Sequence, residues 1–227
     1  MLNDMDRARI SAAIAEAENK SSGEIFCVLA KDVSRYREVP LMWAAVAAFV
    51  VPPLLVMAGL HRLALASIFT SWTDESARAM EGLILRALSA FELGQAGIFL
   101  IVAVIVALPG IRRLMTPGFL KSYRVRQAAR RHFVAVGARL SHAEPHILIY
   151  ASLADRRVEL VAHDNIHKAV GEGPWKESVD AVVEGMKAHK AADGFVKAIG
   201  ICGAALAQHF PPSGAPKNQL PNTLLET

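Results

Sequence analysis

Two long apolar stretches without a charged residue constrain the fold of this chain more than any other feature. They cover residues 41–60 (LMWAAVAAFVVPPLLVMAGL) and 93–111 (LGQAGIFLIVAVIVALPGI). At about 1.5 Å per residue, a helix of either length nearly matches the hydrocarbon thickness of a bilayer, about 30 Å. A chain of 227 residues offers little interior in which to bury two such helices on every side. We therefore predict a transmembrane hairpin over 41–111, with spans 41–60 and 93–111, an outer connection 61–92, and a kink at Pro52 and Pro53.

The basic residues next to these stretches predict the orientation of the hairpin. Residues 112–131 contain seven Lys and Arg and no acid, whereas the connection 61–92 contains three Arg and four acids. Because basic residues remain on the cytoplasmic side, we expect a plasma membrane or inner membrane protein with two spans and both termini in the cytoplasm. Cys27 and Cys202 would then be reduced and buried.

The same basic segment, 112–131, predicts a partner. Immediately cytoplasmic of a span, Lys and Arg meet anionic lipid head groups. The sequence contains no helix-turn-helix, zinc-finger or aromatic RNA-binding pattern, and we therefore predict no binding to nucleic acid.

The polar remainder of the chain shows alternating helix and strand patterns. Helices are expected over 4–18, 119–140, 175–190 and 194–208, and strands over 24–30, 146–152 and 157–162, the last two as an antiparallel hairpin. An amphipathic helix over 77–91, preceded by Thr73 and Asp74, is expected to lie on the membrane surface. The Pro-rich tail, 211–227, is expected to be disordered. The predicted fold class is α/β: a single α/β/α sandwich, formed by 1–40 and 112–210 and interrupted by the transmembrane hairpin.

Several motifs of the polar remainder, taken in order, resemble one known family. They are Ser22-Gly23-Glu24-Ile25 leading into an apolar strand, HILIYASLADRRVELVAHDNI over 146–166, Trp175, and LAQHFP over 206–211. Together they are similar to the TPM domain, a family that includes thylakoid-lumen proteins of photosystem II repair and is often described as phosphatases. The resemblance implies a compact α/β sandwich with a mostly buried sheet. It also implies either acid phosphatase activity or a role in assembly or repair, since relatives of both kinds are known.

The resemblance assigns candidate catalytic residues. Glu24 matches the acid of the Gly-Glu-Ile motif, Arg157 the basic residue that opens the second hairpin strand, and Asp164 the acid after that strand. In a phosphatase, the two carboxylates would hold a divalent cation such as Ca²⁺ or Mg²⁺, and Arg157 would bind the phosphate. His163, directly before Asp164, departs from the family pattern. A purely structural alternative has Glu24 at the surface, Arg157 paired with Glu159, and Asp164 capping a helix.

Histidines offer a second candidate site. His142, Glu144 and His146 alternate along the chain, and His163, Asp164 and His167 cluster after the second hairpin strand. Side chains at alternate positions of an extended segment share one face, so the two sets could form a transition-metal site. Pro145 interrupts the first set, and solvated loop histidines are the alternative interpretation.

The sequence therefore leaves two functions open. The favoured one is a membrane-tethered TPM-like domain that docks on other membrane proteins during their assembly or turnover, since a tether raises the local concentration of such partners. The other is a membrane-anchored phosphatase, with or without a divalent metal ion, that acts on a cytosolic phosphoester. No Gly-x-Ser-x-Gly, P-loop, dinucleotide or His-Glu-x-x-His motif is present. The spans contain no ionisable residue, which argues against a transporter.

Overall fold

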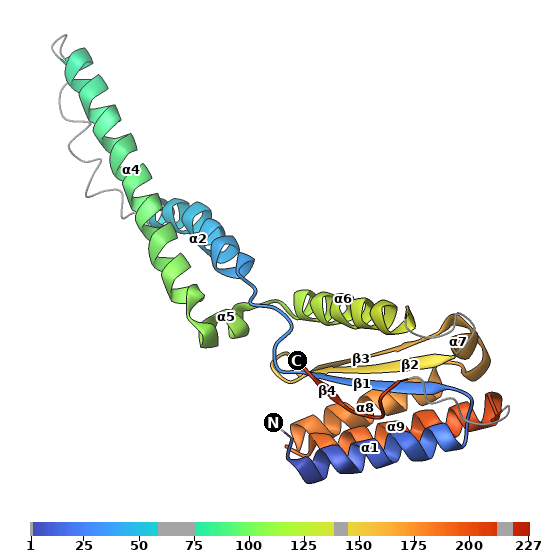
Figure 1. Ribbon diagram of the computed structural model, residues 1–227. Helices are drawn as coiled ribbons and strands as arrows, with labels where there is room; N and C mark the ends of the chain where they lie inside the picture. Colours follow the sequence, from blue (N-terminus) through green and yellow to red (C-terminus); the bar gives the residue numbers. More distant parts are fainter. Residues whose placement is uncertain (1, 59–75, 139–144, 213–219) are drawn as a thin grey trace. The chain divides into compact units, whose positions relative to one another are not determined.

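A computed structural model describes residues 2–58, 76–138, 145–212 and 220–227 of the chain (Figure 1). The chain divides into two compact units. Unit 1 consists of Met1–Arg35 and Pro117–Thr227, and unit 2 of Tyr36–Thr116. Unit 1 is thus assembled from two pieces of sequence, and unit 2 is inserted between them.

Unit 1 contains a four-stranded mixed sheet in the order β3-β2-β1-β4. Strands β1 (Glu24–Ala30), β2 (His146–Ser152) and β3 (Arg157–Ala162) have the predicted bounds. β1 and β2 are parallel, and β2 and β3 form the predicted antiparallel pair. Every residue of β1 and β2 is buried, as expected for apolar strands covered on both faces.

The parallel pairing of β1 and β2 explains how the chain tolerates the insertion. Parallel neighbours require a crossover connection, usually through a helix. Helix α6 (Gly118–Gly137) is that crossover, and unit 2 lies in the connection between β1 and α6. β1 and β2 therefore become neighbours although 115 residues separate them.

Helices cover both faces of the sheet (Figure 1). α1 (Asp4–Asn19), α8 (Gly173–Lys187) and α9 (Ala191–His209) cover one face, and α6 covers the other. A short helix, α7 (Asp164–Val170), follows β3. The side chains of β1 alternate accordingly, with Ile25, Cys27 and Leu29 in the larger core and Phe26 and Val28 in the core under α6. The predicted α/β/α sandwich is therefore the architecture of unit 1.

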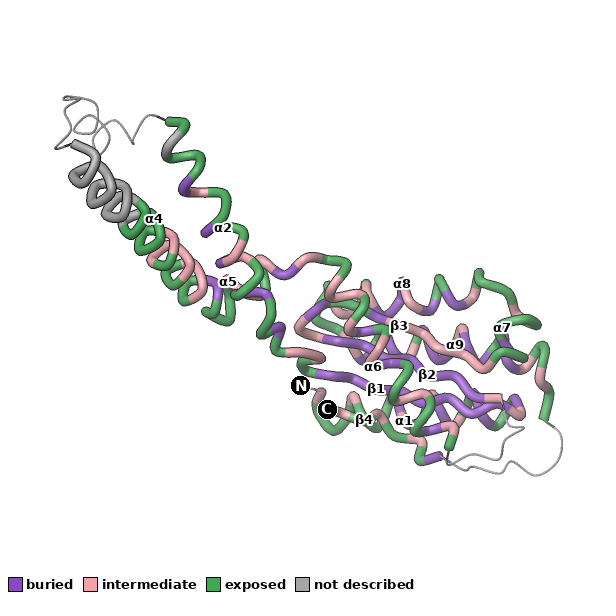
Figure 2. The backbone as a smooth tube through the Cα atoms, turned by 90° about the horizontal axis from the view of Figure 1, so that it is seen from above, coloured by how far each residue is buried: buried purple, intermediate pink, exposed green. Residues whose placement is uncertain are grey.

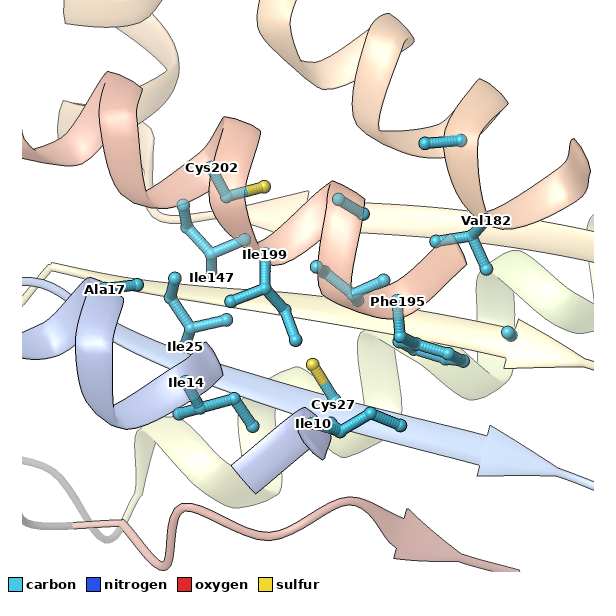
Figure 3. Close-up of a cluster of buried hydrophobic side chains, with 14 of the residues drawn as sticks. Ile10, Ile14, Ala17, Ile25, Cys27, Ile147, Val182, Phe195, Ile199 and Cys202 are labelled. Carbon is cyan, nitrogen blue, oxygen red and sulfur yellow. The ribbon is translucent and has the colours of Figure 1, made fainter. Parts of the chain in front are cut away.

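The larger core contains both cysteines of the chain as free thiols (Figure 3). Both residues are fully buried, and the Sγ of Cys202 lies 3.3 Å from the Oγ of Ser178. Burial raises the pKa of the Cys202 thiol to about 12 and also raises that of Cys27. The prediction of two small buried hydrophobic residues without a disulfide is confirmed.

The prediction of a disordered tail over 211–227 is wrong for its last residues. β4 (Leu225–Glu226) pairs in parallel with Val28 and Leu29 at the edge of β1. The side chain of Leu220 is only 5% exposed and packs in the core under α6. The last residues are ordered because the edge of β1 offers backbone hydrogen-bonding groups that another strand can satisfy. Composition alone does not report such a partner.

The described residues of unit 2 form the helices α2 (Glu38–Met57), α4 (Ser76–Ala107) and α5 (Pro109–Met115). α2 and α4 pack against each other, and α2 continues through Pro52 and Pro53. Much of the surface of α2 and of the described part of α4 is exposed (Figure 2). By length and composition, α2 satisfies the requirement for a membrane span. A second candidate span is found only when Phe91–Ala107 of α4 and the whole of α5 are counted together as one bent segment.

Two details of the predicted hairpin are wrong. The expected surface helix over 77–91 does not end before the second apolar stretch, because α4 runs unbroken from Ser76 to Ala107. Thr73 and Asp74, its expected cap, lie outside the described residues. The helix expected over 93–111 does not continue to residue 111, since α4 ends at Ala107 and the chain bends by 99° between α4 and α5. Pro109 causes this break: it has no N–H to bond to the preceding turn, and it holds Leu108 in an extended conformation (ψ 130°).

Candidate functional site

Glu24 and Asp164, two of the three predicted catalytic residues, lie at the same end of the sheet. Glu24 begins β1 and is in register with His146, the first residue of β2. The backbone N–H of His163 donates to the carbonyl oxygen of His146 at 3.1 Å, and Asp164 then begins α7. We call this end of the sheet, with Glu24, His146, His163 and Asp164, the acidic edge.

Arg157, the third predicted catalytic residue, lies at the opposite end of the sheet. It begins β3 and is in register with Ser152, the last residue of β2. It lies seven positions before Asp164, a separation of about 23 Å in an extended strand. The guanidinium of Arg157 therefore cannot bind a phosphate held by Glu24 or Asp164. The expected three-residue phosphatase site does not form.

The structural alternatives for these residues are also only partly correct. Glu24 is not at the surface but 6% exposed. Glu159 pairs with Arg126 of α6, at 2.8 Å, rather than with Arg157. The cap of α7 is His163, whose Nδ1 accepts from the N–H of Asn165 at 3.5 Å, and Asp164 is the first helical residue.

Aromatic contacts hold the histidines of the acidic edge. The ring of His146 stacks on Phe133 of α6, with 4.3 Å between the ring centroids. The centroid of the His163 ring lies 5.8 Å from that of His146. His146 lies close against the end of α6, where a Cβ added to Gly137 would come within 3.2 Å of its Nε2. Glycine at position 137 thus leaves the space that the imidazole fills.

Glu18 is a buried acid of this edge that the sequence reasoning missed. Its side chain reaches from the end of α1, and its Oε1 accepts from the N–H of Ile25 at 3.1 Å. Glu24 and Asn222 lie close enough to influence its carboxyl group. The helical spacing of Ile10, Ile14 and Glu18 places this acid on the buried face of α1, a signal that was present in the sequence.

Burial of Glu18 changes its titration. The residue is only 9% exposed. Burial raises the pKa of its carboxyl group to about 7, and the neighbouring charge of Glu24 adds to the effect, while the bond from Ile25 opposes it. Near neutral pH the carboxyl group of Glu18 is therefore protonated to a much larger extent than that of an exposed glutamate.

The metal site proposed from the sequence does not find its ligands in the described structure. Within residues 2–58, 76–138, 145–212 and 220–227, no three His, Cys, Asp or Glu side chains are grouped so that they could hold a metal ion. His142 and Glu144 lie outside these residues. In the part of the chain that is described, the residues present do not fit the expected Ca²⁺ or Mg²⁺ ion.

A pocket of about 510 Å³ lies at the other end of the sheet, where β1 and β2 end. Leu29 and Leu153 line it, together with residues from the beginnings of α1 and α9. Three charged residues of its wall contact one another: Arg9 donates to Asp193 at 2.7 Å and lies 3.8 Å from Asp6. The carboxyl ends of parallel strands are a common place for ligands, but here Arg9, Asp6 and Asp193 of the wall pair with one another.

No protein-family model matches the chain, and no curated protein is similar to it. One solved structure is similar over the whole chain. It is the NMR structure of the BA42 protein from the psychrophilic bacterium Bizionia argentinensis, with a TM-score of 0.54 and 18% sequence identity, covering 100% of this chain and 96% of that one. At this identity the similarity concerns the fold alone, and what it establishes for this chain is a mixed α/β architecture.

Proposed function

We propose that this protein is an integral membrane protein whose TPM-like domain, formed by unit 1, docks in the cytoplasm on other membrane proteins during their assembly or turnover. Both termini would be cytoplasmic, and α2 and α4 would cross the plasma membrane or inner membrane. A tethered domain meets membrane partners at high local concentration and needs no active site to act on them.

The observation that supports this proposal best is the apolar surface of α2 and α4. These helices pack against each other, yet each leaves large hydrophobic side chains exposed, among them Leu41, Val46, Phe49, Leu54, Leu100, Ile101 and Val104. In water, a contiguous surface of this kind would cause aggregation. In a bilayer it is the surface that lipid requires.

Charged substitutions on this surface test the membrane tether. Each arginine near the middle of a span costs about 3 kcal/mol of insertion free energy. Phe49→Arg combined with Leu100→Arg, which places one arginine in each of the two helices, should therefore release the protein from carbonate-washed membranes. Leu225→Arg, at an exposed position of β4 in unit 1, is the control and should stay in the membrane. Retention of the double variant would contradict membrane spans in α2 and α4.

The docking function is tested by comparing these proteins in cells. A photo-crosslinker in unit 1, at the exposed position Glu177, should capture membrane proteins when the chain is tethered. The same crosslinker in the Phe49→Arg, Leu100→Arg variant should capture at least tenfold less of the same products, because the local concentration is lost. Equal capture by both proteins would show that docking does not depend on the tether.

The alternative function, a phosphatase, keeps one supporting observation: Glu24 and Asp164 share the acidic edge. Of the two, only Asp164 is exposed, and Glu24 is buried beside Glu18. A phosphatase at this edge predicts that Glu24→Gln and Asp164→Asn abolish turnover of a generic phosphoester by the purified protein. Arg157→Gln, at the far end of the sheet, should leave turnover unchanged. Equal turnover in all four proteins would exclude a catalytic role for this edge.

A further inference from the structure

Helix α6 presents two very different faces. Its inner face packs on the sheet, with Val125, Ala129 and Val136 buried against side chains such as Leu148 and Tyr150. This face completes the smaller core of unit 1. The outer face does not pack on the sheet, so the core of unit 1 does not account for its composition.

The outer face of α6 combines exposed apolar and basic side chains in one stripe. Phe119, Tyr123 and Val134 are 75%, 60% and 69% exposed. Arg126 and Arg130 are exposed at positions between them. At 3.6 residues per turn these five side chains lie within about 80° of the helix circumference. We call these five residues and the neighbouring exposed Arg131 the outer stripe.

This composition is unusual for a helix that faces water. Single exposed apolar residues are common, but three large ones aligned with arginines on one face are typical of helices that lie in the head-group region of a membrane. Aromatic rings occupy the boundary between head groups and acyl chains, and arginines extend from there to the phosphates.

The charged residues of α6 itself all have one sign. The helix contains five Lys and Arg residues and no acid. Arg126 also pairs with Glu159 at 2.8 Å, but its side chain is 60% exposed, and a pair of this kind contributes little to stability. Such a surface is complementary to an anionic one.

The chain connectivity places α6 within reach of the bilayer. The apolar helix α4 ends at Ala107, the seven residues of α5 follow, and α6 begins at Gly118. A seven-residue helix is about 10 Å long. If α4 crosses the membrane, the first residues of α6 lie close to its surface.

We propose that the outer stripe of α6 binds the anionic surface of the bilayer, with Phe119, Tyr123 and Val134 entering the head-group region and the arginines bound to lipid phosphates. This inference rests on the proposed membrane anchor and adds a second, peripheral contact. It also implies an orientation, in which the α6 side of the sheet faces the lipid and α1, α8 and α9 face the cytoplasm.

The buried native cysteines make a direct test possible. Because Cys27 and Cys202 are fully buried, a single new cysteine can be labelled selectively in the folded full-length chain. The Val134→Cys variant carries an environment-sensitive fluorophore on the outer stripe. Glu177→Cys, at an exposed position on α8, is the matched control.

Both labelled proteins are reconstituted in vesicles of phosphatidylcholine alone and of phosphatidylcholine with 30% phosphatidylglycerol. The label at position 134 should shift to shorter emission wavelength and be quenched by brominated lipid in the anionic vesicles, and the label at position 177 should not respond. Adding Arg130→Glu and Arg131→Glu should weaken the response by roughly fivefold per arginine, and added salt should weaken it further.

Other outcomes contradict the proposal in identifiable ways. A label at position 134 that is not quenched in either kind of vesicle overturns it. Quenching that is the same with and without anionic lipid, and with and without Arg130→Glu and Arg131→Glu, also overturns it. Protection of position 134 in native membranes but not in pure lipid would overturn it in favour of a protein partner. In each case, resistance to carbonate extraction reports separately whether the anchor itself is present. Circular dichroism of each variant verifies the fold.

Discussion

Replacing Gly194 by alanine is expected to lower the free energy of unfolding of unit 1 by about 3 kcal/mol. Helices α8 and α9 approach each other closely at Gly185 and Gly194. A Cβ at position 194 would lie 2.8 Å from the carbonyl oxygen of Ala181 and 3.0 Å from the Cα of Val182. Both are backbone atoms, so the two helices must separate. That separation opens the core around Phe195, which is fully buried.

The same helix provides a matched control. Gly200 also lies within α9, but nothing is within 4 Å of the Cβ that alanine would add there. Because alanine favours helix more than glycine, Gly200→Ala should increase stability by about 0.5 to 1 kcal/mol. The two substitutions are chemically identical and should have opposite signs.

Thiol exposure measures this prediction in the full-length protein. Cys27 and Cys202 lie in the core of unit 1, so their reaction with a maleimide during a urea titration reports the opening of that unit alone. For Gly194→Ala, the urea midpoint should fall clearly below that of the wild type. A midpoint equal to that of Gly200→Ala would mean that α8 and α9 do not approach as the structure has them.

The second large effect is expected from Glu18→Gln, and it depends on pH. The pKa of Glu18 is about 7 in the folded protein and 4.5 in its reference state. The folded chain therefore retains a proton that the unfolded chain releases, and the resulting stability is present below pH 4.5 and lost as pH rises through 7. We expect a loss of about 2 kcal/mol, less than the full linkage value because water still reaches part of the site.

Glutamine removes this titration but can keep the hydrogen bond. Its Oε1 can still accept from the N–H of Ile25, and its amide can donate to Glu24. The variant should match the wild type near pH 4.5 and exceed its stability by about 2 kcal/mol at pH 8. Urea midpoints measured across this pH range give the difference in stability between the two proteins. The titration of the histidines is the same in both and cancels in this difference.

Glu16→Gln is the matched control for this experiment. Glu16 lies two residues earlier in α1, is exposed, and pairs with Lys20 at 2.6 Å. Its pH profile should follow that of the wild type. If Glu18→Gln also follows the wild type from pH 4.5 to 8, then Glu18 is not buried as a protonated acid.

Local patterns in the sequence were sufficient for most of the elements of unit 1. The bounds of β1, β2 and β3 were predicted from short apolar runs and the turn between the last two. Asn3 caps α1 and forms a capping box with Asp6. These signals are local, because propensity, alternation and capping depend on residues only a few positions apart.

The candidate site was less accessible from sequence. Glu24 and Asp164 were expected to be together and do share one edge, whereas Arg157 was placed with them and lies at the other end of β3. A motif gives the order of residues along the chain but not their distance along a strand. Glu18 was overlooked because its raised pKa comes from burial by the rest of the fold and from the neighbouring Glu24.

The sequence by itself thus determined where helices and strands of unit 1 form, that both cysteines are buried, and that two long apolar segments interrupt the domain. Only the tertiary structure decided that α4 is one unbroken helix, that residues 225–226 add an edge strand, and that a buried acid pair lies at one end of the sheet. The reason is physical. β4 and β1 are almost two hundred residues apart in the chain, and the free energy of their pairing comes from backbone groups that no local pattern describes.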